Sequence, residues 1–281
     1  MTITAKIIED SISEKNRIRL TTLELTYPRF IHSEVMTHRV FSRNASSSRA
    51  IPILKMLYRI YADMAMPIHW GANQAGMQAN AELTAWRKFI VKSLWIACGY
   101  IVMLFSYMMH LAGAHKQIAN RVTEPWSHIT VVLTATEWQN WFDLRNHADA
   151  QPEIRSLARA IFFAMKASAP RDCGNDKKDV WNWHLPYVKG YERLKYGLAD
   201  LLKMSAARCA RTSYLTHDNK APNVENDIKL HDRLVASKPI HASPTEHQAY
   251  PTDGEEFSAN FRGWQQYRKN VENTIRWNCN A

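Results

Sequence analysis

The feature that most constrains this chain is a run of 17 residues without a charge, from Ser93 to Met109 (SLWIACGYIVMLFSYMM). A helix that is apolar on every side has to be covered by protein or by lipid. The run stands at the short end of the length that crosses a bilayer, and no second run of this kind follows it. We therefore expect a helix over residues 81–114 that is buried in the core or in a subunit interface, rather than a membrane span.

Composition places the chain among globular proteins. Of its 281 residues 46% are hydrophobic and 22% are charged, which is too apolar for a disordered chain. No Gly/Ser linker or internal repeat divides the sequence, so we expect one mixed domain of helices and strands over residues 1–281. The N-terminal segment MTITAKIIEDSISEKNR carries acidic residues and no apolar stretch, so we expect no signal peptide and a cytoplasmic protein. The formal net charge of +10 suggests a polyanionic partner, for which nucleotides, nucleic acid and anionic membrane all qualify.

Residue patterns predict the elements along the chain. The strands are expected over 17–31 and 129–136, the latter fully buried. The helices are expected over 51–64, over 137–169 as one or two amphipathic helices with Pro152 near a start, over 190–211 and over 227–237. Loops are expected over 61–80, 171–183 and 216–226.

One segment is unusually rich in groups that bind phosphate. Residues 37–49 (THRVFSRNASSSR) contain three arginines, one histidine, one asparagine and four serines in thirteen positions. Arginine offers a planar fork of donors that matches phosphate, and serine hydroxyls complete such a cradle. The segment therefore indicates an anion-binding turn after the first strand.

Two further segments bear chemical groups. Residues 142–155 (FDLRNHADAQPEIR) carry Arg145 and Arg155, which Pro152 prevents from sharing one continuous helix. Residues 241–247 (HASPTEH) hold two histidines and a glutamate, but the spacing is not that of a zinc motif and Pro244 interrupts a helix, so we expect no metal site. The chain has neither GxGxxG nor GxxxxGK[ST], so neither a dinucleotide fold nor a P-loop is indicated.

Taken together, these segments resemble the flavin-dependent thymidylate synthases. The signature of that family is Arg-His-Arg, seven residues and Ser, and His38, Arg39 and Ser47 match it. Residues 143–145 and 150–155 resemble the family's Asn-Leu-Arg and Ala-Gln-x-Glu-Ile-Arg segments. Residues 241–247 resemble its His-x-Ser/Thr-Pro-Phe-Glu-His segment, and residues 210–214 its Ala-Arg-x-Ser-Tyr segment.

The order of the segments differs from the common family form. There the last two segments precede the Arg-His-Arg segment, whereas here they follow it. The chain therefore resembles a circularly permuted branch, as found in phage and actinobacterial relatives. It also departs from the family pattern at single positions, which are Thr37 for the first arginine, Ala45 for glutamate, Asp143 for asparagine, Thr245 for phenylalanine and Glu34 for glutamine.

The resemblance implies a fold, a reaction and an assembly. The fold is α+β, with a central antiparallel sheet flanked by long helices. The reaction is C5-methylation of a pyrimidine deoxynucleotide, dUMP to dTMP, with methylenetetrahydrofolate as carbon donor, FAD as hydride carrier and NADPH as reductant. The assembly is a homotetramer with shared active sites, and neither a nucleic acid nor a membrane partner is implied. All these small molecules are anionic, which agrees with the basic charge.

The resemblance also assigns residues. The nucleotide would be held by Glu34, Arg39, Ser47, Ser48, Arg49, His128 and Arg155, of which Arg155, Ser47 and Arg39 are the expected catalytic residues. The flavin would be held by Thr37, His38, Asn44, Arg145, Asp149, Ser213, His241, Ser243 and Glu246. The family's phosphate-binding arginine from a neighbouring subunit has no sure match, and His128 is the nearest residue with Arg121 behind it.

The substrate stays open at the level of sequence. An ionised glutamate at position 34 only accepts hydrogen bonds, as from the amino group of cytosine, so dCMP is an alternative substrate for methylation or hydroxymethylation. The simpler alternative is that Glu34 pairs with a nearby arginine. A third reading is a non-catalytic protein that binds nucleotides or nucleic acid and keeps the fold.

Overall fold

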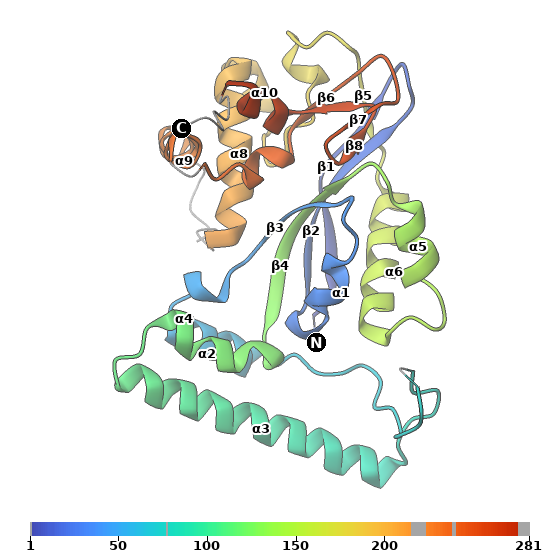
Figure 1. The fold of residues 1–281 in the computed structure, drawn as a ribbon, viewed down its shortest axis with the longest axis vertical. Coiled ribbons are helices and arrows are strands. Elements are labelled where there is room, and N and C mark those ends of the chain that lie inside the picture. The colour runs from blue at the N-terminus through green and yellow to red at the C-terminus, as the bar shows by residue number, and fades with distance from the viewer. Residues whose placement is uncertain (1, 77, 215–222, 238–239, 275–281) are drawn as a thin grey trace, which may run out of the picture.

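The computed structural model describes residues 2–76, 78–214, 223–237 and 240–274. At its centre lies a five-stranded sheet in the order β3-β4-β2-β1-β5. Its strands are β1 (Thr4–Ser13), β2 (Arg19–Pro28), β3 (Ser42–Ala45), β4 (His128–Ala135) and β5 (Arg171–Cys173). Neighbouring strands are antiparallel except β1 and β5, which are parallel. The expected α+β fold is confirmed, with one parallel strand at the edge of the sheet (Figure 1).

One face of the sheet is covered by two helices, α5 (Gln139–Arg145) and α6 (Pro152–Ala167) (Figure 1). Side chains alternate along β2, so Leu23, Leu25 and Tyr27 share the face that packs on α6. From α6 the apolar stripe Ile154, Leu157 and Ile161 completes the main core. Pro152 at the first turn of α6 suits a helix start, because proline there loses no intrahelical hydrogen bond.

The opposite face of the sheet is polar, because Thr22, Glu24 and Thr26 lie between the core residues of β2. Its upper half is covered by the C-terminal half of the chain (Figure 1). These elements are η4 (Val180–Asn182), α7 (Gly190–Lys195), α8 (Leu198–Tyr214), α9 (Val224–Ala236), η5 (Ser243–Glu246), β6 (Ala249–Pro251), β7 (Phe257–Ser258), β8 (Phe261–Arg262), β9 (Trp264–Gln266) and α10 (Tyr267–Thr274).

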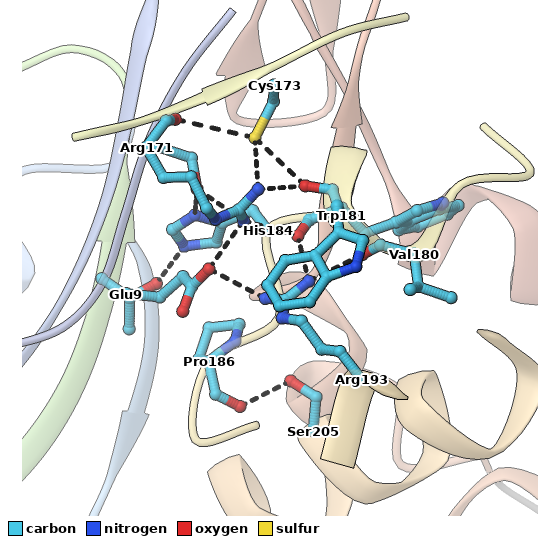
Figure 2. Close-up of polar contacts among 12 residues, drawn as sticks. Glu9, Arg171, Cys173, Val180, Trp181, His184, Pro186, Arg193 and Ser205 are labelled. Carbon is cyan, nitrogen blue, oxygen red and sulfur yellow. Dashed lines mark hydrogen bonds and ion pairs between the residues drawn. The ribbon is translucent and has the colours of Figure 1, made fainter. Parts of the chain in front are cut away.

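A buried polar cluster lies under this covered half, and Figure 2 shows it. The Glu9 carboxylate accepts hydrogen bonds from Arg171 and from Arg193, both at 2.9 Å. Burial raises the pKa of Glu9, while the two guanidinium groups lower it. Nearby, the His184 ring bridges Ser11 and Thr22 at 2.9 and 2.7 Å. The cluster connects β1 and β5 to the C-terminal half by paired charges, beside an apolar group in which Cys173 of β5 packs with Phe261 and Trp264.

A bulge in β1 sets which residues reach this face. The register with β2 runs Lys6 to Glu24 and Ile7 to Leu23, and then shifts so that Glu9 pairs with Thr22. One extra residue in one strand rotates the side chains that follow it. Because of the bulge, Lys6 and Glu9 lie on the same face of the sheet although three positions separate them.

The lower end of the molecule is a layer of helices, which lies across the foot of the sheet in Figure 1. It comprises η1 (Arg29–Ile31), α1 (His32–Met36), η2 (Ser48–Ala50), α2 (Ile53–Ala62), α3 (Ala85–Leu111), α4 (Lys116–Ala119) and η3 (Arg121–Trp126). The α3 helix is attached by Ser106, which donates to the carbonyl of Ala119, and by Trp95, which donates to that of Ala65. These contacts lie along one side of α3.

The other side of α3 is uncovered in the described chain. Phe89, Leu94 and Phe105 are 72%, 60% and 52% exposed. By length and composition α3 is apolar enough to cross a membrane, and 11% of its most apolar window is buried. The expectation of a helix buried in the core is therefore wrong, because α2, α4 and η3 are too few to surround it. The alternative of a subunit interface stays a prediction.

Most of the other expected elements are confirmed. The strand expected over 129–136 is β4, the two amphipathic helices are α5 and α6, and the helix over 51–64 is α2. The strand over 17–31 is β2 followed by η1, and β1 was not expected. The segment 171–183, expected as a loop, contains β5 and η4, while the helix over 190–211 is divided into α7 and α8 at Tyr196 and Gly197. The expected loop 216–226 lies largely outside the described residues.

Candidate functional site

The segment 37–49 leads from α1 into β3 and η2, at the edge of the sheet. His38 is buried there against aromatic rings, with the Trp141 ring edge-on at 4.8 Å and the Phe41 ring at 5.7 Å between centroids. The following strand β3 pairs with β4 from Ser42 to Ala45. The segment is therefore a rigid corner of the fold.

Arg145, at the end of α5, joins this corner from the second predicted segment. Its Nε donates to Nε2 of His38 at 3.0 Å, and its Nη2 donates to the hydroxyl of Thr37 at 3.1 Å. Burial lowers the pKa of His38, and the neighbouring guanidinium groups of Arg145 and Arg43 lower it further. His38 is thus held as a neutral imidazole that accepts at Nε2. Three residues of the expected flavin set, Thr37, His38 and Arg145, form one contact group.

The C-terminal segment lies against the same corner. Gln266 of β9 donates to the hydroxyl of Ser42 at 3.1 Å and to the carbonyl of Glu246 at 2.9 Å. The Glu246 carboxylate accepts from Arg268. Burial raises the pKa of Glu246, while Arg268 and Arg43 lower it. The structure therefore brings Glu246 close to β3.

The remaining residues of the expected flavin set are less well connected. Asn44 is buried in β3, and its amide nitrogen has no partner among the described residues. Asp149 is exposed and lies 3.5 Å from His147. His241 and Ser243 are exposed, with no side-chain contact to His38 or Arg145 among the described residues. Ser213 belongs to the last turn of α8, and its side chain lies outside the described residues.

The expected nucleotide residues are distributed along the motif rather than gathered. Arg39 and Arg49 are exposed, and Ser47 is half-buried. Ser48 is buried and donates to Glu124 at 2.6 Å, so its hydroxyl already has a structural partner. Glu34 accepts from Ser33 at 2.9 Å. The arginine partner suggested for Glu34 is absent among the described residues.

Arg155 lies apart from these residues, in the first turns of α6. With Arg159 and Ser156 it lines a small cavity of about 260 Å³. Its Nε is buried and has no partner among the described residues. Two guanidinium groups beside the start of a helix form a site suited to an anion.

A larger cavity, of about 660 Å³, opens on the polar face of the sheet. Its floor is made by β1, β2 and β4, its lower wall by α2, and its upper wall by Tyr187 and α8. His128 lies on this cavity, with its Nδ1 3.7 Å from Asp63 and its buried Nε2 without a partner among the described residues. Burial lowers the pKa of His128, while Asp63 raises it.

Sequence reasoning missed most of the cavity wall, notably Lys6, Glu24, Arg59 and Tyr187. The charged residues of β1 and β2 carried a signal, since Lys6 and Glu24 occupy the non-core positions of their strands. No sequence signal indicated Tyr187, because its position depends on a positive φ that no motif predicted.

Comparison with known proteins finds a family match over part of this region. A sequence model of the thymidylate synthase complementing protein family matches residues 124–171. This segment contains His128, Arg145 and Arg155, and over it the resemblance seen in the sequence is confirmed.

Among solved structures, the chain is similar to a pyrimidine nucleotide methylase. The chain is similar to a UMP/dUMP methylase, PolB from Streptomyces cacaoi, bound with 5-Br dUMP, at 15% identity over 58% of this chain and 90% of that chain, with a TM-score of 0.48. The same protein bound with 5-Br UMP matches at 16% identity over 58% and 88% of the two chains, again with a TM-score of 0.48. No curated protein matches.

Proposed function

We propose that this chain is an enzyme of the flavin-dependent thymidylate synthase type, which methylates C5 of a pyrimidine deoxynucleotide. The observation that carries the proposal is the contact between Arg145, inside the segment matched by the family, and His38, inside the Arg-His-Arg motif. Two motifs that are far apart in the sequence thus share one corner of the fold. The reaction proposed takes its carbon unit from methylenetetrahydrofolate and its electrons from NADPH, as in the conversion of dUMP to dTMP, with dCMP as the alternative nucleotide.

The corner offers groups that fit a flavin dinucleotide. Arg145 uses two of its five N–H groups on Thr37 and His38, which leaves donors for a pyrophosphate. The unpartnered amide nitrogen of buried Asn44 is a second donor. When bound, FAD supplies the hydride chemistry, and the protein supplies position and charge. Arg145 would hold the cofactor, and the packing of His38 on Trp141 would keep Arg145 in place.

The substrate would be bound by Arg155 and His128. Arg155 lines one cavity and His128 another, and both belong to the matched segment. Guanidinium groups beside a uracil carbonyl and a phosphate stabilise the negative charge that develops when C5 becomes nucleophilic. Holding two reactants in register lowers the entropic part of the barrier. These residues lie in separate cavities of one chain, so we propose that a neighbouring subunit completes the site.

The exposed side of α3 supports a subunit contact. The outward residues from Leu94 to Leu111 include no charged group of Lys, Arg, Asp or Glu, and many large apolar side chains there are exposed. Soluble monomers rarely expose an apolar patch larger than a few hundred Å². We therefore propose that α3 packs on a second copy of this chain, within the expected homotetramer, in a cytoplasmic protein. The permuted order and a phage source remain parts of the same proposal.

Two measurements test the reaction. The purified protein should be yellow, with the absorbance of oxidised flavin, and should release tritium from 5-tritiated dUMP when reduced flavin and methylenetetrahydrofolate are present. Release from 5-tritiated dCMP instead would indicate the sister activity on cytosine nucleotides. A colourless protein that releases tritium from neither nucleotide would overturn both enzymatic readings and leave a non-catalytic binding protein.

A further inference from the structure

The large cavity contains a pair of side chains whose position is fixed at a cost in backbone strain. Tyr187 has φ of 63°, a left-handed conformation that aromatic residues rarely adopt. Its carbonyl accepts from Arg208 at 2.8 Å, and the preceding carbonyl of Pro186 accepts from Ser205 at 2.8 Å, the latter drawn in Figure 2. The strained turn is thus held on two sides.

The support behind this turn is a buried ion network. Arg208 contacts Glu192 at 2.7 Å and Asp227 at 2.8 Å, and all three side chains are nearly inaccessible to solvent. A charge network buried this deeply has little freedom to rearrange. Its donor to Tyr187 therefore fixes where the phenol enters the cavity.

The phenol of Tyr187 orients the carboxylate of Glu24. Its hydroxyl donates to Oε2 of Glu24 at 2.6 Å, and both residues line the cavity. Burial raises the pKa of Tyr187, and Glu24 raises it further, so the hydroxyl keeps its proton and can only donate to the carboxylate. A carboxylate has about four acceptor positions, of which this bond uses one. The upper end of the cavity therefore presents a fixed acceptor.

The lower end of the cavity presents a cation. The Arg59 guanidinium of α2 has no ion-pair partner among the described residues, and beside it His128, whose Nδ1 lies 3.7 Å from the Asp63 carboxylate, has a buried Nε2 without a partner. The register of β2 and β4 pairs Glu24 with Val132 and Pro28 with His128. The two ends are therefore four residues apart along the sheet, about 14 Å at roughly 3.4 Å per residue.

The floor between the two ends carries hydroxyl groups. Thr26 and Thr130 are register partners, with their hydroxyl oxygens 3.4 Å apart, and both line the cavity. The Glu24 acceptor, the threonine hydroxyls and the Arg59 guanidinium thus follow one another in a single direction along the sheet. Base, sugar and phosphate follow one another in the same way in a nucleotide.

We propose that this cavity binds a pyrimidine nucleotide whose base carries an exocyclic amino group, with the amino group on Glu24 and the phosphate on Arg59 and His128. The proposal rests on the proposed function and names its substrate as cytosine-type rather than uracil-type. An ionised carboxylate accepts from the N4 amino group of cytosine, whereas uracil presents its O4, an acceptor, at the same place. The volume of about 660 Å³ suits a ligand of this size.

The test compares dCMP, dUMP and dAMP by calorimetric titration of the full chain. The wild type should bind dCMP at least about tenfold more tightly than dUMP, as expected for one discriminating polar contact, and should reject dAMP. Glu24→Gln should lose or invert the preference, because an amide can donate to O4 of uracil. Glu225→Gln is the matched control on an exposed glutamate of α9 and should keep the wild-type preference.

Two more variants sharpen the assignment. Tyr187→Phe removes the donor that orients Glu24 and should reduce the dCMP preference. Arg59→Ala should weaken dCMP and dUMP by the same factor, because the phosphate is common to both.

Several outcomes would overturn the assignment. Equal binding of dCMP and dUMP by the wild type would do so, as would a Glu24→Gln variant with wild-type preference. Inversion by Glu34→Gln alone would move the base contact to Glu34. In each of these cases, tritium release from dUMP would still support the proposed methylation. A wild type that binds no nucleotide and releases no tritium would refute both the methylation and the cytosine-type substrate.

Discussion

Arg145 donates from Nε to Nε2 of His38 at 3.0 Å across a sequence separation of 107 residues. The direction of this bond requires a neutral imidazole, since a protonated ring has no acceptor. The contact between Arg145 and His38, and with it the position of the Arg145 guanidinium, therefore depends on pH.

The first prediction is a pH dependence that belongs to His38. Because burial and Arg145 hold its folded pKa below the ordinary 6.5, the unfolded chain binds the proton more readily than the folded chain. Stability from this contact should be complete above about pH 6.5 and should fall as pH drops below it. Urea unfolding at several pH values should show a smaller acid loss in His38→Gln, whose side-chain oxygen still accepts from Arg145. Equal slopes in wild type and variant would contradict the assignment.

The second prediction concerns the buried cluster of Figure 2. Glu9→Gln leaves Arg171 and Arg193 close together without their carboxylate, and Arg193 is almost fully buried. Removing one partner of a buried ion pair costs about 3–5 kcal/mol. The free energy of unfolding from urea titration should fall by an amount of this order. Glu225→Gln breaks an exposed pair with Lys229 and should cost about 0.5 kcal/mol or less.

The third prediction concerns the exposed side of α3. Leu94→Glu and Phe105→Glu place a charge on the outward face, so they should shift the protein to smaller species in analytical ultracentrifugation, with unchanged far-ultraviolet circular dichroism. Leu194→Glu is the control, because Leu194 of α7 is 78% exposed and lies away from α3. A monomeric wild type would remove α3 from any subunit contact. Binding of the wild type to anionic vesicles would then indicate that the exposed side of α3 contacts lipid.

The fourth prediction tests Arg155. Arg155→Ala should weaken nucleotide binding by about tenfold or more, since a charge-assisted hydrogen bond contributes roughly 1.5–3 kcal/mol, while flavin content stays the same. Equilibrium titration and the flavin absorbance report the two quantities separately. Arg87→Ala removes an exposed arginine of α3 and serves as the control. Wild-type nucleotide affinity in Arg155→Ala would exclude this arginine from the site.

The fifth prediction tests Glu246. Glu246→Ala removes the carboxylate that faces Arg268 beside β3, and the flavin content of the purified protein should fall. Full flavin occupancy in this variant would place the cofactor elsewhere. Arg268→Ala breaks the same ion pair while keeping the carboxylate. It therefore separates a loss of flavin caused by the missing carboxylate from one caused by the broken ion pair.

Local patterns predicted much of the fold. The uncharged β-branched run over 129–136 became β4 because a strand buried on both faces shows no alternation. Pro152 marked the start of α6 because proline is tolerated in the first helical turn. The edge strand β5 was missed because three residues, one of them Cys173, are too few to show a period.

The candidate site was predictable only in part. The motif residues His38 and Arg145, which the resemblance assigned to the same flavin set, are in contact. Glu24 and Tyr187 belong to no motif, and their contact depends on a positive φ and on a buried ion network. Long-range placement of this kind is set by tertiary packing, which a single sequence does not display.

The bulge at Ile7–Glu9 lets two charges of β1 that are three positions apart serve the same face of the sheet. Upstream of it, Lys6 faces the cavity, and downstream of it, Glu9 faces the paired arginines. Flattening the bulge without shortening the strand would restore strict alternation over these positions, and one of the two charges would turn toward the leucines under α6. Deleting Ile8 removes the extra residue and leaves Lys6 and Glu9 two positions apart on the same face, so the strand should tolerate the loss of Ile8 better than the loss of the bulge alone.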